Sequence, residues 1–232
     1  MNRRTFAFVV FAILMAGGCV RLGFWQLSRL GERRTRNAQI AGRLNAPSAP
    51  WREITRDSAH ARYRRVRLTG RFDYARELVL TSRGRNGAPG VHVISPLQVG
   101  DGPVVLVNRG WAYSADGMAI DLSQWHERDS ATVDGFVDEF VAARGMVSTM
   151  SQPRGVRQLV RDSIAARLGE PIAAFFVVQQ MVSATGGLNE HLVRVDPPTL
   201  GEGSHRSYAI QWFAFAAIAL IGTVAVLRQS NR

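Results

Sequence analysis

The sequence predicts an α+β membrane protein in which two transmembrane helices flank a soluble, mainly antiparallel β-sheet or small-barrel domain. Apolar residues concentrate near the two ends of the 232-residue chain, whereas the region between them mixes charges, turns and short alternating runs. We expect a first transmembrane helix over residues 5–27 and a basic helix and connector over 28–62. An α+β domain over 63–200 and a second transmembrane helix over 206–228 complete the chain.

The second apolar run is long enough to cross a membrane. From Ser207 to Leu227 there are 21 residues without a formal charge, and Arg228 follows them. A bilayer core needs about 20 helical residues, each rising about 1.5 Å. The run therefore predicts a spanning helix.

The first apolar run is shorter, with 15 residues from Phe6 to Val20 before Arg21. If Arg21 reaches toward the lipid headgroups and Trp25 lies at the interface, the segment becomes long enough to span. We therefore expect a transmembrane helix here as well.

A cleaved lipoprotein signal is the alternative for this first run. Two arginines precede a short apolar core that ends at Cys19, the only cysteine of the chain. The match is poor, because Ala16 stands where a large aliphatic residue is expected. Lipidation of Cys19 stays open.

The charge pattern argues against a nucleic-acid partner. The formal net charge is +11, and all 29 basic residues are arginine. A phosphate-binding protein normally uses both arginine and lysine, so the bias indicates genomic composition. Because a translocated domain of about 180 residues escapes the positive-inside rule, we expect the domain on the outer side of the membrane.

Alternating runs predict the strands of the domain. In "RVRLTGRF" the apolar Val66, Leu68 and Phe72 fall on even positions, which is typical of a half-buried strand. Gly100 to Gly102 has the composition of a hairpin turn. The further strand candidates are "ELVLTS", "GVHVISPLQV", "PVVLVNRGW", "ATVDGFV", "IAAFFVV" and "HLVRV".

One helix is expected among these strands. Val156, Leu159, Val160, Ile164 and Leu168 recur at helical spacing. A glycine and then a proline follow this run, which is how a helix commonly ends.

The sequence predicts no enzyme. Its histidines form no pair at metal-ligand spacing, and serine-nucleophile motifs are absent. His92 lies in an alternating strand, where we expect it to face solvent, and His191 begins a strand candidate. His205 differs, because it precedes a membrane run by less than one turn. Both an interfacial anchor and a functional group fit that position.

Three blocks resemble the surfeit-locus family of cytochrome c oxidase assembly proteins. They are "GFWQLSR" after the first apolar run, "VRLTGRFD" with "PGVHVISPL" and "VLVNRGW" in the body, and "HRSYAIQWF" at the second apolar run. Together they cover nearly the whole chain in the family's order. We identify a bacterial member of this family.

The resemblance implies a multi-pass protein of the bacterial inner membrane with a periplasmic domain. It implies binding of haem a for delivery to oxidase subunit I, alongside other assembly factors. His205 would be the ligand of the haem iron, and Tyr208 and Trp212 follow it in the family pattern. Trp25 and Arg29, from the first block, would lie beside the haem or pair with its propionates.

Two departures from the family pattern favour an alternative. Gly203 stands where the family often has asparagine, and Gln179 and Gln180 stand where an acidic residue is common. The alternative is a membrane-anchored scaffold that docks on nascent oxidase without binding haem. We expect Arg109 and Trp111 of "NRGW" to fix the turn of a core strand rather than to contact a ligand.

Overall fold

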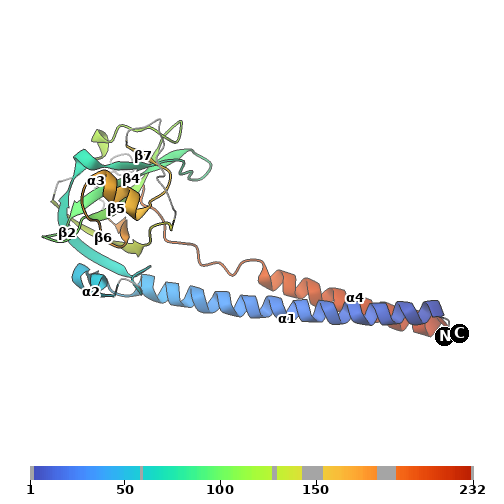
Figure 1. Ribbon diagram of the computed structural model, residues 1–232. Helices are drawn as coiled ribbons and strands as arrows, with labels where there is room; N and C mark the ends of the chain where they lie inside the picture. The colour runs from blue at the N-terminus through green and yellow to red at the C-terminus, as the bar shows by residue number, and fades with distance from the viewer. Residues whose placement is uncertain (1–2, 58–59, 127–129, 143–153, 182–191, 231–232) are drawn as a thin grey trace. The chain divides into compact units, whose positions relative to one another are not determined.

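The computed structural model describes residues 3–57, 60–126, 130–142, 154–181 and 192–230. The chain forms two compact units, each described here by itself. One combines Met1–Ala41 with Thr199–Arg232, and the other is Gly42–Pro198 (Figure 1).

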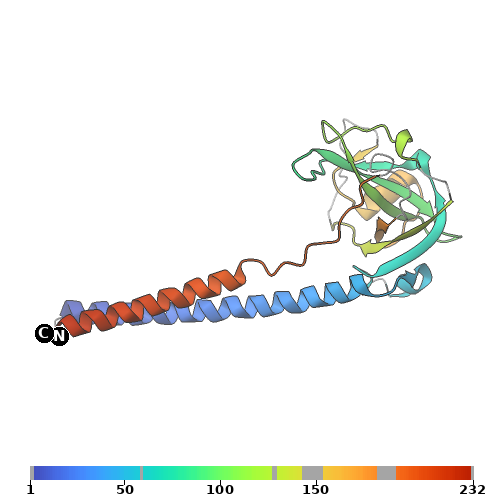
Figure 2. The ribbon, with the colours of Figure 1, turned by 180° about the vertical axis from the view of Figure 1, so that it is seen from behind.

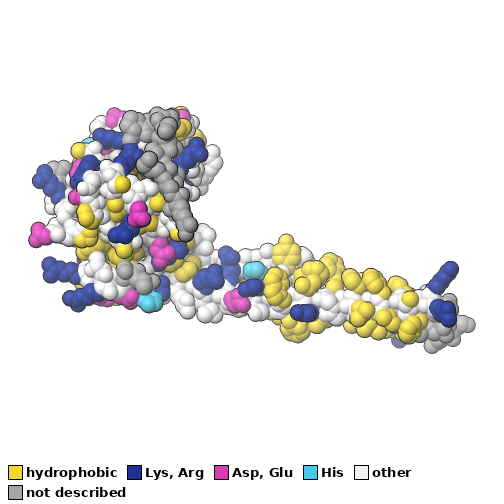
Figure 3. All heavy atoms as spheres, viewed as in Figure 1, with side chains coloured by type: hydrophobic (Ala, Val, Ile, Leu, Met, Phe, Trp, Pro, Cys, Tyr) yellow, Lys and Arg dark blue, Asp and Glu magenta, His cyan; other side chains and the backbone are white. Residues whose placement is uncertain are grey.

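Two long helices make up the first unit. Helix α1 is Arg3–Asn45 and helix α4 is His205–Ser230. They run antiparallel and side by side, so the start of α1 and the end of α4 lie together (Figures 1 and 2). Both are long and apolar enough to cross a membrane. Apolar side chains cover much of the length of the helix pair, and most of its charged side chains lie beyond the ends of this apolar stretch (Figure 3).

Helix α1 does not break where a separate basic helix was expected to begin. It continues for 43 residues, about 65 Å at 1.5 Å per residue, which is twice the thickness of a bilayer core. Residues 28–45 contain no proline, and Arg29 pairs with Glu32 one turn on at 2.8 Å. The helix ends at Asn45, two residues before Pro47, because the residue preceding a proline is disfavoured in helical conformation.

Small residues bring the two helices together. Ala16 and Cys19 of α1 form one buried cluster with Ala216 of α4. A methyl group added at Gly23 would lie 2.7 Å from the ring of Phe213. Close approach of this kind is a common basis of helix association in membranes, where lipid is as apolar as the side chains.

The second unit is a closed barrel with short attachments. Strands β2 (Arg65–Phe72), β6 (Ser130–Asp138), β8 (Phe176–Met181), β5 (Val105–Tyr113) and β4 (Gly90–Gln98) pair in that order, and β4 pairs back to β2. The remaining elements are β1 (Ala49–Pro50), α2 (Trp51–Arg56), η2 (Tyr74–Arg76), β3 (Leu78–Leu80), η3 (Ser123–Trp125), β7 (Gly155–Val156) and α3 (Arg161–Leu168). Pairing is antiparallel except for β1 with β2, β3 with β7 and β5 with β8. The predicted α+β architecture is confirmed.

Two apolar clusters pack the faces of this barrel. Alternate residues of the ring strands, such as Leu68, Val107 and Val133, form one of them. The neighbouring positions, such as Leu106, join Ile164 of α3 in the other. The period-two pattern in β2 therefore fixed its inward residues correctly.

Some element predictions need correction. The helix predicted from Val156 begins only at Arg161, because Val156 belongs to β7 and pairs with Leu80. All three residues of β3 are buried, so this strand does not alternate between core and solvent. The last strand candidate contributes only a bridge between Val193 and Trp111, and His191 lies outside the described residues. The hairpin at Gly100 to Gly102 is confirmed by the β4–β5 register.

Candidate functional site

His205 is the first residue of α4 and is half-buried against α1. Its Nδ1 lies 2.8 Å from Oε1 of Gln26. An amide oxygen accepts hydrogen bonds, so with this amide orientation Nδ1 carries a proton, and in the neutral imidazole Nε2 then has the lone pair. Among the described residues, no hydrogen bond to Nε2 occurs. The ring is thereby oriented as a metal-ligating histidine is oriented by its outer-shell partner.

Residues 199–204, which lead into α4, are held along α1. Arg33 donates from Nε to the carbonyl of Gly201 at 2.7 Å, and Asn37 donates to the carbonyl of Leu200 at 3.1 Å. Arg34 pairs with Glu202 at 2.7 Å. The hydrogen bond from Arg34, with a smaller Coulombic contribution, lowers the pKa of the Glu202 carboxyl. These contacts fix the start of α4 relative to α1, and hence the position of His205.

Gly203 supplies the turn before His205. Its φ is +70°, in the left-handed region that glycine enters freely and asparagine enters more readily than most residues. The asparagine expected here from the family resemblance would meet the same backbone requirement, and glycine meets it too. The departure at Gly203 therefore leaves the start of α4 in place.

An aromatic stripe continues from His205 along α4. Tyr208, Trp212 and Phe215 follow at spacings that keep them near one side of the helix, and the last two rings meet edge to face at 6.0 Å. Tyr208 is 47% exposed, and Trp212 packs against the Ala16 and Cys19 cluster. This stripe is an apolar wall beside an available imidazole nitrogen.

The structure does not bring Trp25 and Arg29 to this wall. Consecutive helical residues are about 100° apart, so Trp25 lies nearly opposite Gly23, which faces α4. Trp25 is 49% exposed, and the Arg29 guanidinium lies over its ring at 5.7 Å. Gln26, which belongs to the "GFWQLSR" block but was not predicted as a site residue, lies beside His205 instead. A polar residue at the spacing of the buried Cys19 and Gly23 is the signal that could have found it.

Comparison with known protein families gives a match over most of the chain. The SURF1 family model matches residues 13–217. The chain belongs to the SURF1 family. This family is linked to cytochrome c oxidase assembly.

Individual SURF1-like proteins match over different lengths. A SURF1-like protein of Monosiga brevicollis is 27% identical over 90% of this chain and 84% of its own length. An uncharacterized SURF1-like protein of Mycobacterium bovis is 26% identical over 85% of this chain and 73% of its own. A SURF1-like protein of Rickettsia felis is 33% identical over 48% of this chain, and the match spans 46% of that relative.

Inside the barrel of this SURF1 member lies a buried ion pair. Arg109 and Glu77 have side chains that are 0% exposed, and their nearest nitrogen and oxygen atoms are 3.1 Å apart. Glu77 also accepts hydrogen bonds from Ser95 Oγ and, at 3.0 Å, from His126 Nε2. Arg109 further donates to the carbonyl of Trp125. The arginine of the "NRGW" block is therefore bonded within the interior of the domain, and Glu77 is a partner that the sequence did not predict.

The expectation that His92 faces solvent is wrong. It is largely enclosed, with Nδ1 3.1 Å from Nδ2 of Asn108 on the neighbouring strand. Burial lowers the pKa of His92 to about 4, and the charges of Arg83 and Arg85 contribute further. The loop after β3 is held to strand β5, because the carbonyl of Arg83 accepts a hydrogen bond from Trp111 Nε1 at 2.6 Å.

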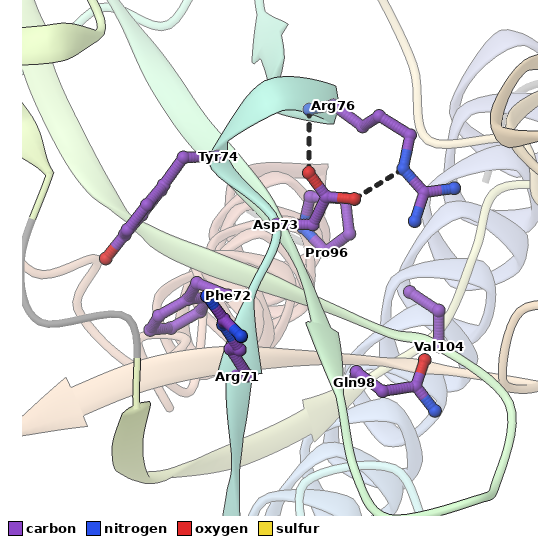
Figure 4. Close-up of a pocket in the computed structure, with 8 residues that line it drawn as sticks. All are labelled: Arg71, Phe72, Asp73, Tyr74, Arg76, Pro96, Gln98 and Val104. Carbon is purple, nitrogen blue, oxygen red and sulfur yellow. Dashed lines mark hydrogen bonds and ion pairs between the residues drawn. The ribbon is translucent and has the colours of Figure 1, made fainter.

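A groove of about 510 Å³ opens where β2 passes into η2 (Figure 4). Phe72, Tyr74 and Arg76 contribute to its lining. In this groove the Asp73 carboxylate accepts a hydrogen bond from Arg76 Nε at 2.6 Å. Arg76 also forms an ion pair with Glu170 at 2.5 Å. No histidine lines this groove among the described residues. Its chemistry gives no reason to prefer it to the His205 site.

Proposed function

We propose that this SURF1-family protein assists cytochrome c oxidase assembly by holding haem a at His205 and passing it to oxidase subunit I. The hydrogen bond between Gln26 and His205 carries this proposal, because it leaves Nε2 with a lone pair for iron. The proposal includes contact with other assembly factors and an outer, periplasmic position of the barrel domain.

The residues around His205 fit a haem. Bound haem would supply an iron that accepts an axial imidazole and a large apolar ring. Trp212 and Phe215 offer aromatic surface of the required kind at the level where α4 enters the apolar run. Within the described residues no group of three or more metal-ligating side chains competes for the iron.

A single histidine from this chain also suits a carrier. Cargo must be retained in the membrane and then released, so a second strong protein ligand would oppose transfer. Gln26 adjusts the retention, since an outer-shell partner orients the ligand and raises its basicity. His205 is the ligand in this scheme, and Gln26 is a positioning residue.

The test is an optical spectrum of the detergent-purified protein produced together with haem a synthesis. We expect haem a in the wild type and its loss in His205→Ala. His60→Ala, at an exposed histidine of the other unit, is the matched control and should keep the haem. Gln26→Leu should weaken haem retention about tenfold to a hundredfold, the usual effect of removing such a partner.

The same spectra address the scaffold alternative. A wild-type protein that purifies without haem under these conditions, yet still co-purifies with oxidase subunits, would be a membrane-anchored scaffold. Loss of haem in His60→Ala as readily as in His205→Ala would also exclude His205 as the specific ligand.

A further inference from the structure

Arg21 is the only charged residue of the sequence between Arg4 and Arg29. It is exposed in α1 and makes no hydrogen bond or ion pair with any residue that the structure describes. Eight residues, about 12 Å of helix, separate it from Arg29. Charged side chains inside a membrane are costly and normally have a partner.

Contacts with α4 define the level of Arg21. Cys19 and Gly23 flank it in α1 and pack against Ala216 and Phe213 of α4. These α4 residues lie seven to ten positions beyond the arginine that precedes the uncharged run of α4. At 1.5 Å per residue, Arg21 lies about 10–15 Å inside that run.

The side chain is too short to leave the membrane on the side of Arg29. With bonds near 1.5 Å, an arginine guanidinium reaches about 6 Å from its Cα. Helical side chains also tilt toward the helix N-terminus, so Arg21 leans deeper into the apolar region. At this depth, snorkelling alone does not bring the charge to the headgroups.

Arg21 points away from α4. It lies two residues, about 200° around the helix, from Gly23, which contacts Phe213. Gly17 and Gly18 lie one turn below on the same outward side, and a methyl group added at either would meet nothing within 4 Å. A second helix could therefore approach the backbone closely just below the charge.

From this placement we infer that the outward side of α1 at Leu14, Gly17, Gly18 and Arg21 docks a transmembrane helix of a partner protein. That helix carries an Asp or Glu at the depth of Arg21. A second copy of this chain does not fit, because neither apolar run contains an acidic residue and two Arg21 side chains would repel. The inference does not depend on haem binding.

The test is photo-crosslinking of the full-length protein in native membranes. Benzoylphenylalanine replaces Leu14 on the docking side and, as control, Ile218 on α4. Both positions are exposed and lie two residues from the Ala16 and Ala216 contact, hence at one depth. We expect Leu14 to give one discrete adduct with a protein whose crosslinked helix contains Asp or Glu, and Ile218 not to give it.

Substitutions of Arg21 make the result specific. Arg21→Leu increases apolarity, so loss of insertion would not explain its effect, and we expect the adduct to fall about threefold to thirtyfold. Arg21→Lys should keep most of the adduct. Arg21→Glu should abolish the adduct, and in that variant a change of the partner's acidic residue to arginine should restore it.

Three outcomes would overturn the inference. The first is an adduct with lipid alone, which would mean that Arg21 does reach headgroups. The second is an adduct with another copy of this chain. The third is a protein adduct whose yield does not change in Arg21→Leu.

Discussion

The barrel and the helix pair treat their polar groups in opposite ways. In the barrel, Glu77 and Arg109 are fully buried and bonded to each other and to further groups. In the helix pair, one ring nitrogen of His205 is hydrogen-bonded, and Arg21 is exposed within the apolar part of α1. A buried charge that is paired maintains a fold, whereas a polar group left available in an apolar setting is suited to a ligand or a partner.

The largest effect is expected at the buried ion pair. Glu77→Leu leaves the Arg109 charge without its carboxylate, so we expect a loss of about 3–5 kcal/mol in unfolding free energy. Urea unfolding of the full chain in detergent measures it. The double variant Glu77→Leu with Arg109→Leu should lose less than the two single variants together. Full additivity would mean that the two side chains do not act as a pair.

A pH dependence should separate His92 from the exposed histidines. Because the pKa of His92 is lowered to about 4 in the folded protein, the unfolded chain binds its proton first as pH falls. The unfolding free energy should be at its full value above pH ~6.5 and should fall by roughly 3 kcal/mol as the pH is lowered to ~4. His92→Gln should flatten this part of the profile. An unchanged profile in that variant would assign the titration elsewhere.

A smaller effect is expected where the helices touch. Gly23→Leu would push against Phe213 and cost about 1–3 kcal/mol of packing, as overfilled contacts do. Disulfide formation between Cys19 and an Ala216→Cys partner should slow accordingly. Gly222→Leu, at a position with nothing within 4 Å, is the control. Equal rates in both variants would contradict the close contact at Gly23.

The smallest effect belongs to the exposed pair of Arg34 and Glu202. Arg34→Ala should return the pKa of Glu202 toward its ordinary value, because the hydrogen bond from Arg34 is the main cause of the lowering. Any stability from this pair is present above the ordinary pKa of Glu202 and is lost as pH falls below it. Carbon-13 NMR of labelled glutamate would measure the shift. If the pKa of Glu202 stayed at its wild-type value in Arg34→Ala, a group other than Arg34 would be the cause of its lowering.

Patterns local in sequence predicted the fold well. Period-two alternation located Val66, Leu68 and Phe72, and the uncharged length of α4 was evident from residues 207–227. Interactions between distant segments were less accessible. Glu77 meets Arg109 across 32 positions, and Gln26 meets His205 across 179. The helical spacing of apolar residues gave a wrong prediction at Val156, because this residue pairs with β3 in a sheet.

Closure of the barrel through β2 and β4 limits how other proteins can recognise this domain. A closed ring uses the backbone donors and acceptors of its strands, and the described extensions end in β1 and β7, each two residues long. Little backbone remains for an incoming strand to extend the sheet. Other proteins must therefore recognise the domain mainly through its surface side chains. Single substitutions can change such a surface without disturbing the pairing that closes the barrel.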